Sequence, residues 1–174
     1  DGRWNYTWDA ENRLIVSVVN TAVGTQQYLA FEYDCQGRRI GKKIWNNTTG
    51  SGQPATAWKF MYDGWNLVAA LNGSSVLQQS FLWGLDLSGS EQGAGGVGGL
   101  LVEKTVANGS HFTAYDGNGN VAALVSVTNS AVTARYEYGP FGEVLRSSGA
   151  MAKVNPFRFS TKYTDGESDL LFYG

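Results

Sequence analysis

Short runs of alternating polar and apolar residues follow one another along most of this chain, separated by turn-forming residues. Alternation with a period of two is typical of β-strands, and clusters of Gly, Asn, Asp and Ser between such runs indicate tight turns. The expected strands are 14–20, 27–34, 38–45, 59–62, 66–71, 76–83, 100–106, 111–115, 121–127, 131–138 and 143–146. No stretch has the periodicity of an amphipathic helix. The pattern therefore predicts an all-β fold made of consecutive antiparallel β-hairpins.

A phrase recurs where these hairpins turn: an aromatic residue, then Asp or Gly, then a short turn and an aliphatic run. Its copies are Trp8-Asp9, Tyr33-Asp34, Tyr62-Asp63, Tyr115-Asp116 and, as a variant, Tyr138-Gly139-Pro140-Phe141-Gly142. A repeat of a few tens of residues is typical of an array in which each unit buries its apolar face against its neighbours. We interpret these residues as structural turn motifs.

The segment 84–99 interrupts the hairpin rhythm because glycine dominates its second half. Such density fits either a flexible linker or a backbone packed so closely that a Cβ atom would clash. The apolar residues on both sides, 81–83 and 100–102, favour the packed alternative.

Composition excludes several classes of function. Charged residues make up 16% of the 174 residues, against roughly 25% in an ordinary soluble domain, and the net charge is −2. This charge gives no electrostatic attraction toward nucleic acid. No apolar run approaches the roughly 20 residues of a membrane-spanning helix. Both ends fall within repeat-like sequence, so we expect a fragment of a longer chain.

The residues that could carry chemistry do not form a recognisable set. His111 is the only histidine, and Cys35 is the only cysteine and takes a turn position, so neither supports a metal site, a catalytic triad or an internal disulfide. Residues 116–120 resemble the start of a calcium loop, but the sixth and twelfth positions are both valine, which favours a hairpin turn. The acidic residues of 165–169 are expected to lie in a turn. We predict no catalytic residue, no metal site and no cofactor.

Three longer stretches carry a resemblance to a known family. They are 83–101, with its Trp-Gly-Leu-Asp-Leu-Ser-Gly start and Gly-rich continuation; 136–143, Tyr-Glu-Tyr-Gly-Pro-Phe-Gly-Glu; and 155–174, which begins Asn-Pro-Phe-Arg-Phe-Ser-Thr-Lys-Tyr. Together with the Tyr-Asp phrases, they resemble the Rhs/YD-repeat family, in particular its C-terminal repeat-associated core. The resemblance implies hairpin repeats over 1–80 and a core-like region over 81–174, in one continuous unit.

In that family, hairpins wind into a curved, spiral sheet that forms a hollow shell around a C-terminal toxin. The resemblance therefore implies a secreted or cell-surface bacterial protein whose partners are the rest of its own polypeptide and a toxin or effector cargo. Family members often release the toxin by self-cleavage at an Asp-Pro-x-Gly-type motif. No Asp-Pro occurs in this chain, because its prolines at 54, 140 and 156 follow other residues, so self-cleavage is not carried over.

The function that we predict is a structural wall segment without chemistry of its own. A second hypothesis is a subunit that joins neighbouring copies end to end into a fibre through open strand edges. A third is a carbohydrate-binding adhesive module that uses exposed tryptophans, of which the candidates are Trp4, Trp8, Trp45, Trp58, Trp65 and Trp83. An enzyme ranks last, since one His, one Cys and scattered carboxylates assemble no catalytic set.

Overall fold

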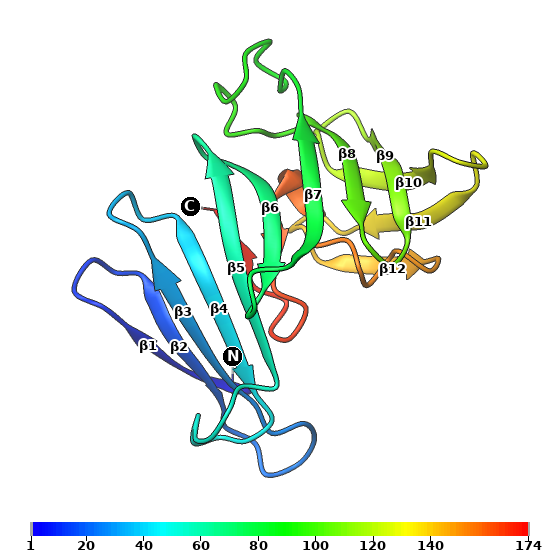
Figure 1. Ribbon diagram of the computed structural model, residues 1–174. Helices are drawn as coiled ribbons and strands as arrows, with labels where there is room; N and C mark the ends of the chain where they lie inside the picture. Colours follow the sequence, from blue (N-terminus) through cyan, green and yellow to red (C-terminus); the bar gives the residue numbers. More distant parts are fainter. Residues whose placement is uncertain (1, 174) are drawn as a thin grey trace. The chain divides into compact units, whose positions relative to one another are not determined.

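The computed structural model describes residues 2–173 and is all-β (Figure 1). Twelve antiparallel strands form one sheet in which the order in space follows the order along the chain, and two further short strands pair separately. The strands are β1 (Trp4–Trp8), β2 (Leu14–Val19), β3 (Tyr28–Tyr33), β4 (Arg39–Trp45), β5 (Thr56–Asp63), β6 (Asn66–Asn72), β7 (Leu77–Trp83), β8 (Leu100–Thr105), β9 (Gly109–Tyr115), β10 (Val121–Ser126), β11 (Val132–Tyr138), β12 (Val144–Ser148), β13 (Tyr163–Thr164) and β14 (Leu171–Phe172). A 3₁₀ turn, η1 (Phe159–Thr161), is the only helical element of residues 2–173. The prediction of consecutive antiparallel hairpins is confirmed.

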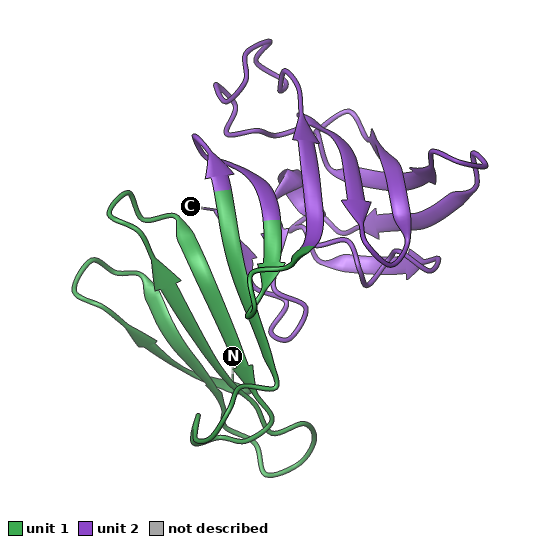
Figure 2. Ribbon diagram, viewed as in Figure 1, with its two compact units in different colours: residues 1–61, 70–77, 174 green, residues 62–69, 78–173 purple. Residues whose placement is uncertain are grey.

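The chain divides into two compact units, whose described residues are 2–61 with 70–77 and 62–69 with 78–173 (Figure 2). The division passes through β5 and β6. We call these unit 1 and unit 2 and describe each by itself.

Unit 1 is held together by one face of its sheet. Trp4, Val19, Leu29, Phe31 and Ile44 form a buried hydrophobic cluster, to which each of β1 to β4 contributes. Leu29 and Phe31 are buried on β3 while Glu32 is exposed, as expected for side chains that alternate between two faces. The alternation seen in the sequence is therefore the alternation between core and solvent.

The core of unit 2 is closed by the segment that follows β12. The ring of Phe157 makes edge-to-face contacts with Phe81 and Trp83, at centroid distances of 5.0 and 5.3 Å. The Tyr136 hydroxyl donates to the carbonyl of Ala152 at 3.0 Å, and Met151 is 1% exposed. Residues 151–157 thus lie on the face of the sheet that carries Phe81 and Tyr136.

The elements differ from the sequence-based expectation in several places. β1 was not expected as a strand, β9 begins at Gly109 instead of His111, and β12 extends to Ser148 instead of Arg146. Three further differences have a local reason. The strand expected at 143–146 begins at Val144, because Glu143 belongs to the preceding turn. The strand expected at 59–62 begins earlier, at Thr56, because Thr56 and Ala57 pair with β4. The pair β13–β14 was not expected, since two-residue strands leave no periodic pattern in a sequence.

Substitution of Gly149 tests how the chain leaves β12. Gly149 has φ +99°, and a Cβ atom there would clash with the backbone oxygen of Thr133. We expect Gly149→Ala to lower the free energy of unfolding by about 2 kcal/mol or more, because both the backbone conformation and the contact oppose a side chain. Urea denaturation measures the change.

Gly117→Ala is the matched control, since a Cβ atom there meets nothing within 4 Å and the φ angle lies outside the left-handed region. Equal stability of the two variants would contradict the role assigned to Gly149.

Candidate functional site

Six turns of the chain share one five-residue geometry. In the turn 34–38 the N–H of Asp34 donates to the carbonyl of Arg38 at 3.0 Å, and the N–H of Gly37 donates to the carbonyl of Asp34 at 3.1 Å. The same two hydrogen bonds close the turns 9–13, 34–38, 72–76, 86–90, 116–120 and 139–143. The fourth residue has positive φ in every case: Asn12, Gly37, Ser75, Gly89, Gly119 and Gly142. We call these six segments the repeat turns.

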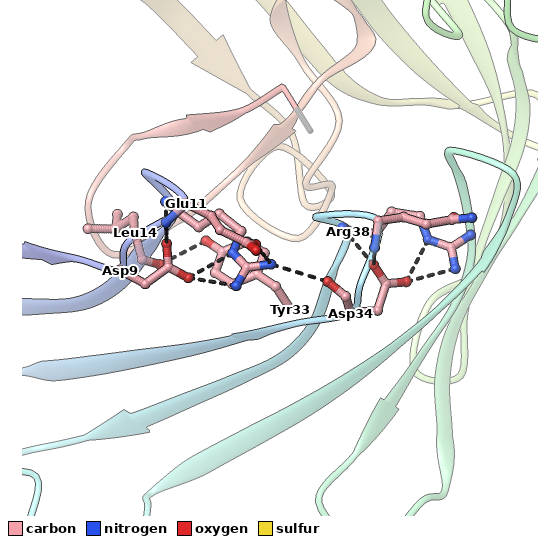
Figure 3. Close-up of polar contacts among 8 residues, drawn as sticks. Asp9, Glu11, Leu14, Tyr33, Asp34 and Arg38 are labelled. Atoms are coloured by element: carbon pink, nitrogen blue, oxygen red, sulfur yellow. Dashed lines mark hydrogen bonds and ion pairs between the residues drawn. The ribbon is translucent and has the colours of Figure 1, made fainter.

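In three of the aromatic–acid phrases, the acidic residue (Asp9, Asp34 or Asp116) is the first residue of a repeat turn and holds the turn together. Oδ1 of Asp34 accepts the N–H groups of Gln36 and Arg38 at 2.9 and 3.0 Å, and Oδ2 accepts Nε of Arg38 at 2.7 Å (Figure 3). Partial burial opposes ionisation of Asp34, but these hydrogen bonds outweigh it and keep its pKa below the usual 3.8. The carboxylate thus satisfies backbone donors that the turn itself leaves unpaired.

Two other repeat turns, 9–13 and 116–120, also have a carboxylate on their first residue that accepts backbone N–H groups. Asp9 binds the N–H groups of Glu11 and Arg13 in the first turn, and Asp116 binds those of Asn118 and Asn120. These copies show that one side-chain oxygen on the first residue serves both the third and the fifth N–H group.

The turn 139–143 begins with Gly139 and has no acid at that position. Oε2 of Glu143 instead accepts the N–H of Phe141 at 3.0 Å, so the carboxylate comes from the fifth position. Pro140 suits the second position because its fixed φ matches a turn.

The aromatic residue before the turn connects one hairpin to the preceding one. The hydroxyl of Tyr33 donates to the carbonyl of Leu14, the first residue of β2, at 2.8 Å (Figure 3). Tyr115 donates in the same way to Leu100 at 2.6 Å, and Tyr138 to Val121 at 2.8 Å. We call these bonds aromatic staples.

Trp83 makes a fourth aromatic staple, from its indole Nε1 to the carbonyl of Leu67 at 2.7 Å. In all four, the acceptor lies at or near the start of the second strand of the preceding hairpin. Trp8 has the equivalent position in β1, and its side chain is 53% exposed.

The turn after Tyr62 has a different construction. Asp63 and Asn66 end and begin strands around only two residues, and Gly64 has φ 56°. The side chain of Gln92 accepts the N–H of Trp65 and donates to the carbonyl of Asp63, both at 3.0 Å. The Gly-rich segment therefore supplies the polar groups that the first residue supplies in the repeat turns.

The Gly-rich segment is packed, as its apolar flanks indicated. Oδ2 of Asp86 accepts the N–H groups of Ala94 at 2.7 Å and Gly96 at 3.1 Å. The Ser88 hydroxyl and three backbone N–H groups stabilise the carboxylate against the cost of partial burial and lower the pKa of Asp86 to about 2. A neighbouring Thr161 hydroxyl accepts the N–H of Gly98 and donates to the carbonyl of Gly119. Asp86 thus folds the segment around itself.

Sequence reasoning missed several residues of this network. Asn72 and Asp86 each begin a repeat turn, but no Tyr precedes them, so the aromatic–acid phrase did not reveal them. A search for Asp or Asn three residues before a Gly or Ser that can take positive φ would have found both. Nothing local in the sequence identifies Gln92 or Thr161, whose partners lie far away in the chain.

The residues considered for chemistry do not come together. His111 is 2% exposed on β9 in unit 2, whereas Cys35 is exposed in a repeat turn of unit 1. Asp165 is buried and accepts the backbone N–H of Asp169 within a turn. Across residues 2–173, no three His, Cys, Asp or Glu side chains are grouped closely enough to hold a metal ion. No helix in this part of the chain has the length and apolar character needed to cross a membrane.

Most of the tryptophans take structural positions. Trp4 is buried in the cluster of unit 1, and Trp45 donates to the carbonyl of Gly52 and packs edge-to-face on Tyr28 at 5.6 Å. Trp65 is 49% exposed, close to the value for Trp8. Trp58 is half-buried, so Trp8 and Trp65 are the exposed tryptophans among residues 2–173.

No family model matches the chain. Among curated proteins, it is 25% identical over 175 residues to the tRNA3(Ser)-specific nuclease WapA of Bacillus spizizenii and to the tRNA nuclease WapA of Bacillus subtilis strain 168. Each match covers 99% of this chain and 6% of the relative, so the chain spans a small part of these proteins. The similarity is consistent with the Rhs/YD-repeat family.

Among solved structures, the chain is similar to parts of Tc toxin complexes. The TcdB2-TccC3-TEV structure matches with a TM-score of 0.66 and 14% identity, over 100% of this chain and 8% of that one. A Photorhabdus luminescens Tc holotoxin pore matches with a TM-score of 0.65 and 16% identity, over 99% and 8%. These likenesses show that the chain has the fold of a segment of those proteins.

Removal of one staple tests the link between hairpins. We expect Tyr115→Phe to lower the free energy of unfolding by about 1–2 kcal/mol, because the carbonyl of the fully buried Leu100 loses its side-chain donor. Chemical denaturation measures the change. Tyr173→Phe is the control, since that side chain is 58% exposed, and an equal loss in both variants would contradict the staple.

A second prediction concerns acid stability. The pKa of Asp86 lies below its usual value in the folded chain, so its stabilising effect is present above pH 3.8 and is lost as the pH falls through about 2. Asp86→Asn should therefore lower the thermal midpoint at pH 7, with a difference from the parent chain that disappears toward pH 2. Calorimetry across this range measures it.

Glu91→Gln is the control, because it removes an exposed carboxylate from the same segment, and it should leave the dependence of the thermal midpoint on pH unchanged. A difference between Asp86→Asn and the parent chain that stays constant with pH would contradict the prediction.

Proposed function

We propose that this chain is a wall segment of a shell of YD-type hairpins that encloses or carries a toxin polypeptide, and that it acts through shape without chemistry of its own. The observation that carries the proposal is the repeated pairing of an acid-closed turn with an aromatic staple to the preceding hairpin. Through this pairing, a hairpin bonds to the hairpin before it and offers a backbone carbonyl to the hairpin after it. A sheet of that kind grows by addition along the chain, which is what a wall requires.

The fold comparison supports the same function, because Tc toxin complexes contain a segment of this fold. The relatives named as tRNA nucleases are matched over only 6% of their length, so we assign no nuclease activity to this chain. We further propose that residues 1–80 contribute hairpin repeats and that residues 81–174 form a core-like region. In this proposal the protein is secreted or lies on the bacterial surface.

A fibre is the second candidate, and the edge of the sheet favours it. β12 is the last strand in the sheet order, and all five of its residues are exposed. An open edge of this kind can pair with a strand of another copy. Sedimentation and electron microscopy distinguish the candidates, because fibres lengthen with protein concentration whereas a shell keeps a fixed size.

The wall function is tested on the complete polypeptide that contains this segment. Limited proteolysis should leave a C-terminal polypeptide protected, and Tyr115→Phe combined with Asp116→Ala should expose it to cleavage by loosening one hairpin. Gly117→Ala in the same turn is the control and should retain protection. A complete polypeptide with no protected portion, although circular dichroism shows native β structure, would refute the wall function.

A further inference from the structure

Two ionisable side chains face one another inside unit 2. Glu103 on β8 and His111 on β9 are direct partners in the antiparallel register, so their side chains leave the sheet on the same face. Glu103 is 0% exposed and His111 is 2% exposed. Their neighbours on the outer face, such as Lys104 and Phe112, are exposed.

The carboxyl group of Glu103 has no hydrogen-bond partner among the described residues, and the imidazole of His111 is only partly satisfied, through the backbone of Gly109. Both carboxyl oxygens of Glu103 and Nδ1 of His111 are buried without a partner among the described residues, and the hydroxyls of Thr113 and Thr164 share this condition. A buried charge without a partner costs far more than a buried neutral group. The pair is therefore stable in the core only with a net charge of zero, which means that it holds one proton in total.

The surroundings offer little to compensate a net charge. Phe81 of β7 lies opposite Glu103, and Ser126 of β10 lies opposite His111. Tyr136 of β11 interacts electrostatically with Glu103, and burial raises the pKa of its phenol, so it stays neutral at ordinary pH. Arg158 directly follows residues 151–157, and its guanidinium lies 5.9 Å from the centre of the Tyr136 ring. Lys153, the charged residue within 151–157, is exposed.

The covering segment 151–157 completes this enclosure. Phe157 packs on Phe81, the cross-strand neighbour of Glu103, and Asn155 donates to the hydroxyl of Tyr136 at 3.3 Å. Asn155 and Phe157 are both buried. Removal of the segment from the sheet would open the face that carries Phe81, Tyr136 and the Glu103–His111 pair to water.

We propose that Glu103 and His111 form a proton-dependent latch, which holds the covering segment 151–157 on the sheet of unit 2 while the pair carries one proton and releases it when the pair becomes charged. The latch uses groups of unit 2 alone and is independent of the wall function.

The direction of the pH effect follows from the two groups. Burial raises the pKa of Glu103 from 4.5 to about 8, so its contribution to docking is complete below pH 4.5 and is lost as the pH rises toward 8. Burial lowers the pKa of His111 below 6.5, so its contribution is present above pH 6.5 and is lost as the pH falls. Between pH 4.5 and 6.5 the two effects oppose one another. Above pH 6.5, Glu103 alone determines how steeply docking of the segment weakens with rising pH.

Hydrogen–deuterium exchange of the 174-residue chain tests the latch. After correction for intrinsic exchange rates, the opening equilibrium of 151–157 should rise roughly tenfold per pH unit between about pH 6.5 and 8, because opening releases one proton. This slope depends only on the number of protons held and not on which partner holds the proton. Exchange in β2 to β4 of unit 1 serves as the internal reference and should lack the slope.

Two variants separate the partners. Glu103→Gln should abolish the slope above pH 6.5, because the amide has no proton to lose. His111→Gln should keep that slope and remove the loss of docking at acid pH. Glu137→Gln, an exposed carboxylate on β11, is the control and should behave as the parent chain.

The same slope in Glu103→Gln and in the parent chain would overturn the latch. If Glu103→Gln does not fold, carboxyl ¹³C NMR of the parent chain decides the matter. A Glu103 signal that titrates near its ordinary value of 4.5 would refute the proposal, and one that titrates well above pH 6.5 would support it.

Discussion

The structure depends on one constraint in its turns: five residues must reverse the chain without leaving buried or crowded N–H groups unpaired. The fourth residue makes the chain reversal possible by taking positive φ, as Gly37 and Asn12 do. A side-chain oxygen pairs the free N–H groups by accepting those of the third and fifth residues, as Asp34 does. Where the oxygen is on a carboxylate, as in Asp34, each bond is charge-assisted and stronger than a neutral one. In the turn 72–76 the amide oxygen of Asn72 takes the same place.

The same constraint explains why the aromatic residue stands directly before the acid. The register of the hairpin shifts at that point, for example where Tyr33 pairs with Arg39, and the aromatic side chain then reaches the carbonyl at the start of the preceding hairpin's second strand. A Tyr or Trp serves because each combines a large apolar ring with one donor at its end. Turn closure and hairpin linkage are thus joined in two consecutive residues.

Unit 2 also contains hydrogen bonds between segments that lie far apart in the chain. Asp86 binds N–H groups of the Gly-rich segment, Gln92 completes the turn after Tyr62, and Thr161 joins Gly98 to Gly119. The covering segment encloses Glu103 and His111, whose carboxyl oxygens and Nδ1 are buried without a hydrogen-bond partner, as are the hydroxyls of Thr113 and Thr164. An unsatisfied buried pair in an otherwise well-bonded core suits a switch better than it suits a support.

The sequence by itself determined the hairpin succession, because strand alternation and turn composition act over a few residues and leave a direct pattern. It also identified the Tyr-Asp phrases and the packed character of the Gly-rich segment. Only the tertiary structure decided that Asn72 and Asp86 begin further repeat turns, that Tyr33 bonds to Leu14, and that Glu103 faces His111 beneath the covering segment. These facts depend on contacts between residues far apart in the chain or on strand register, and a local pattern of residue types carries no information about either.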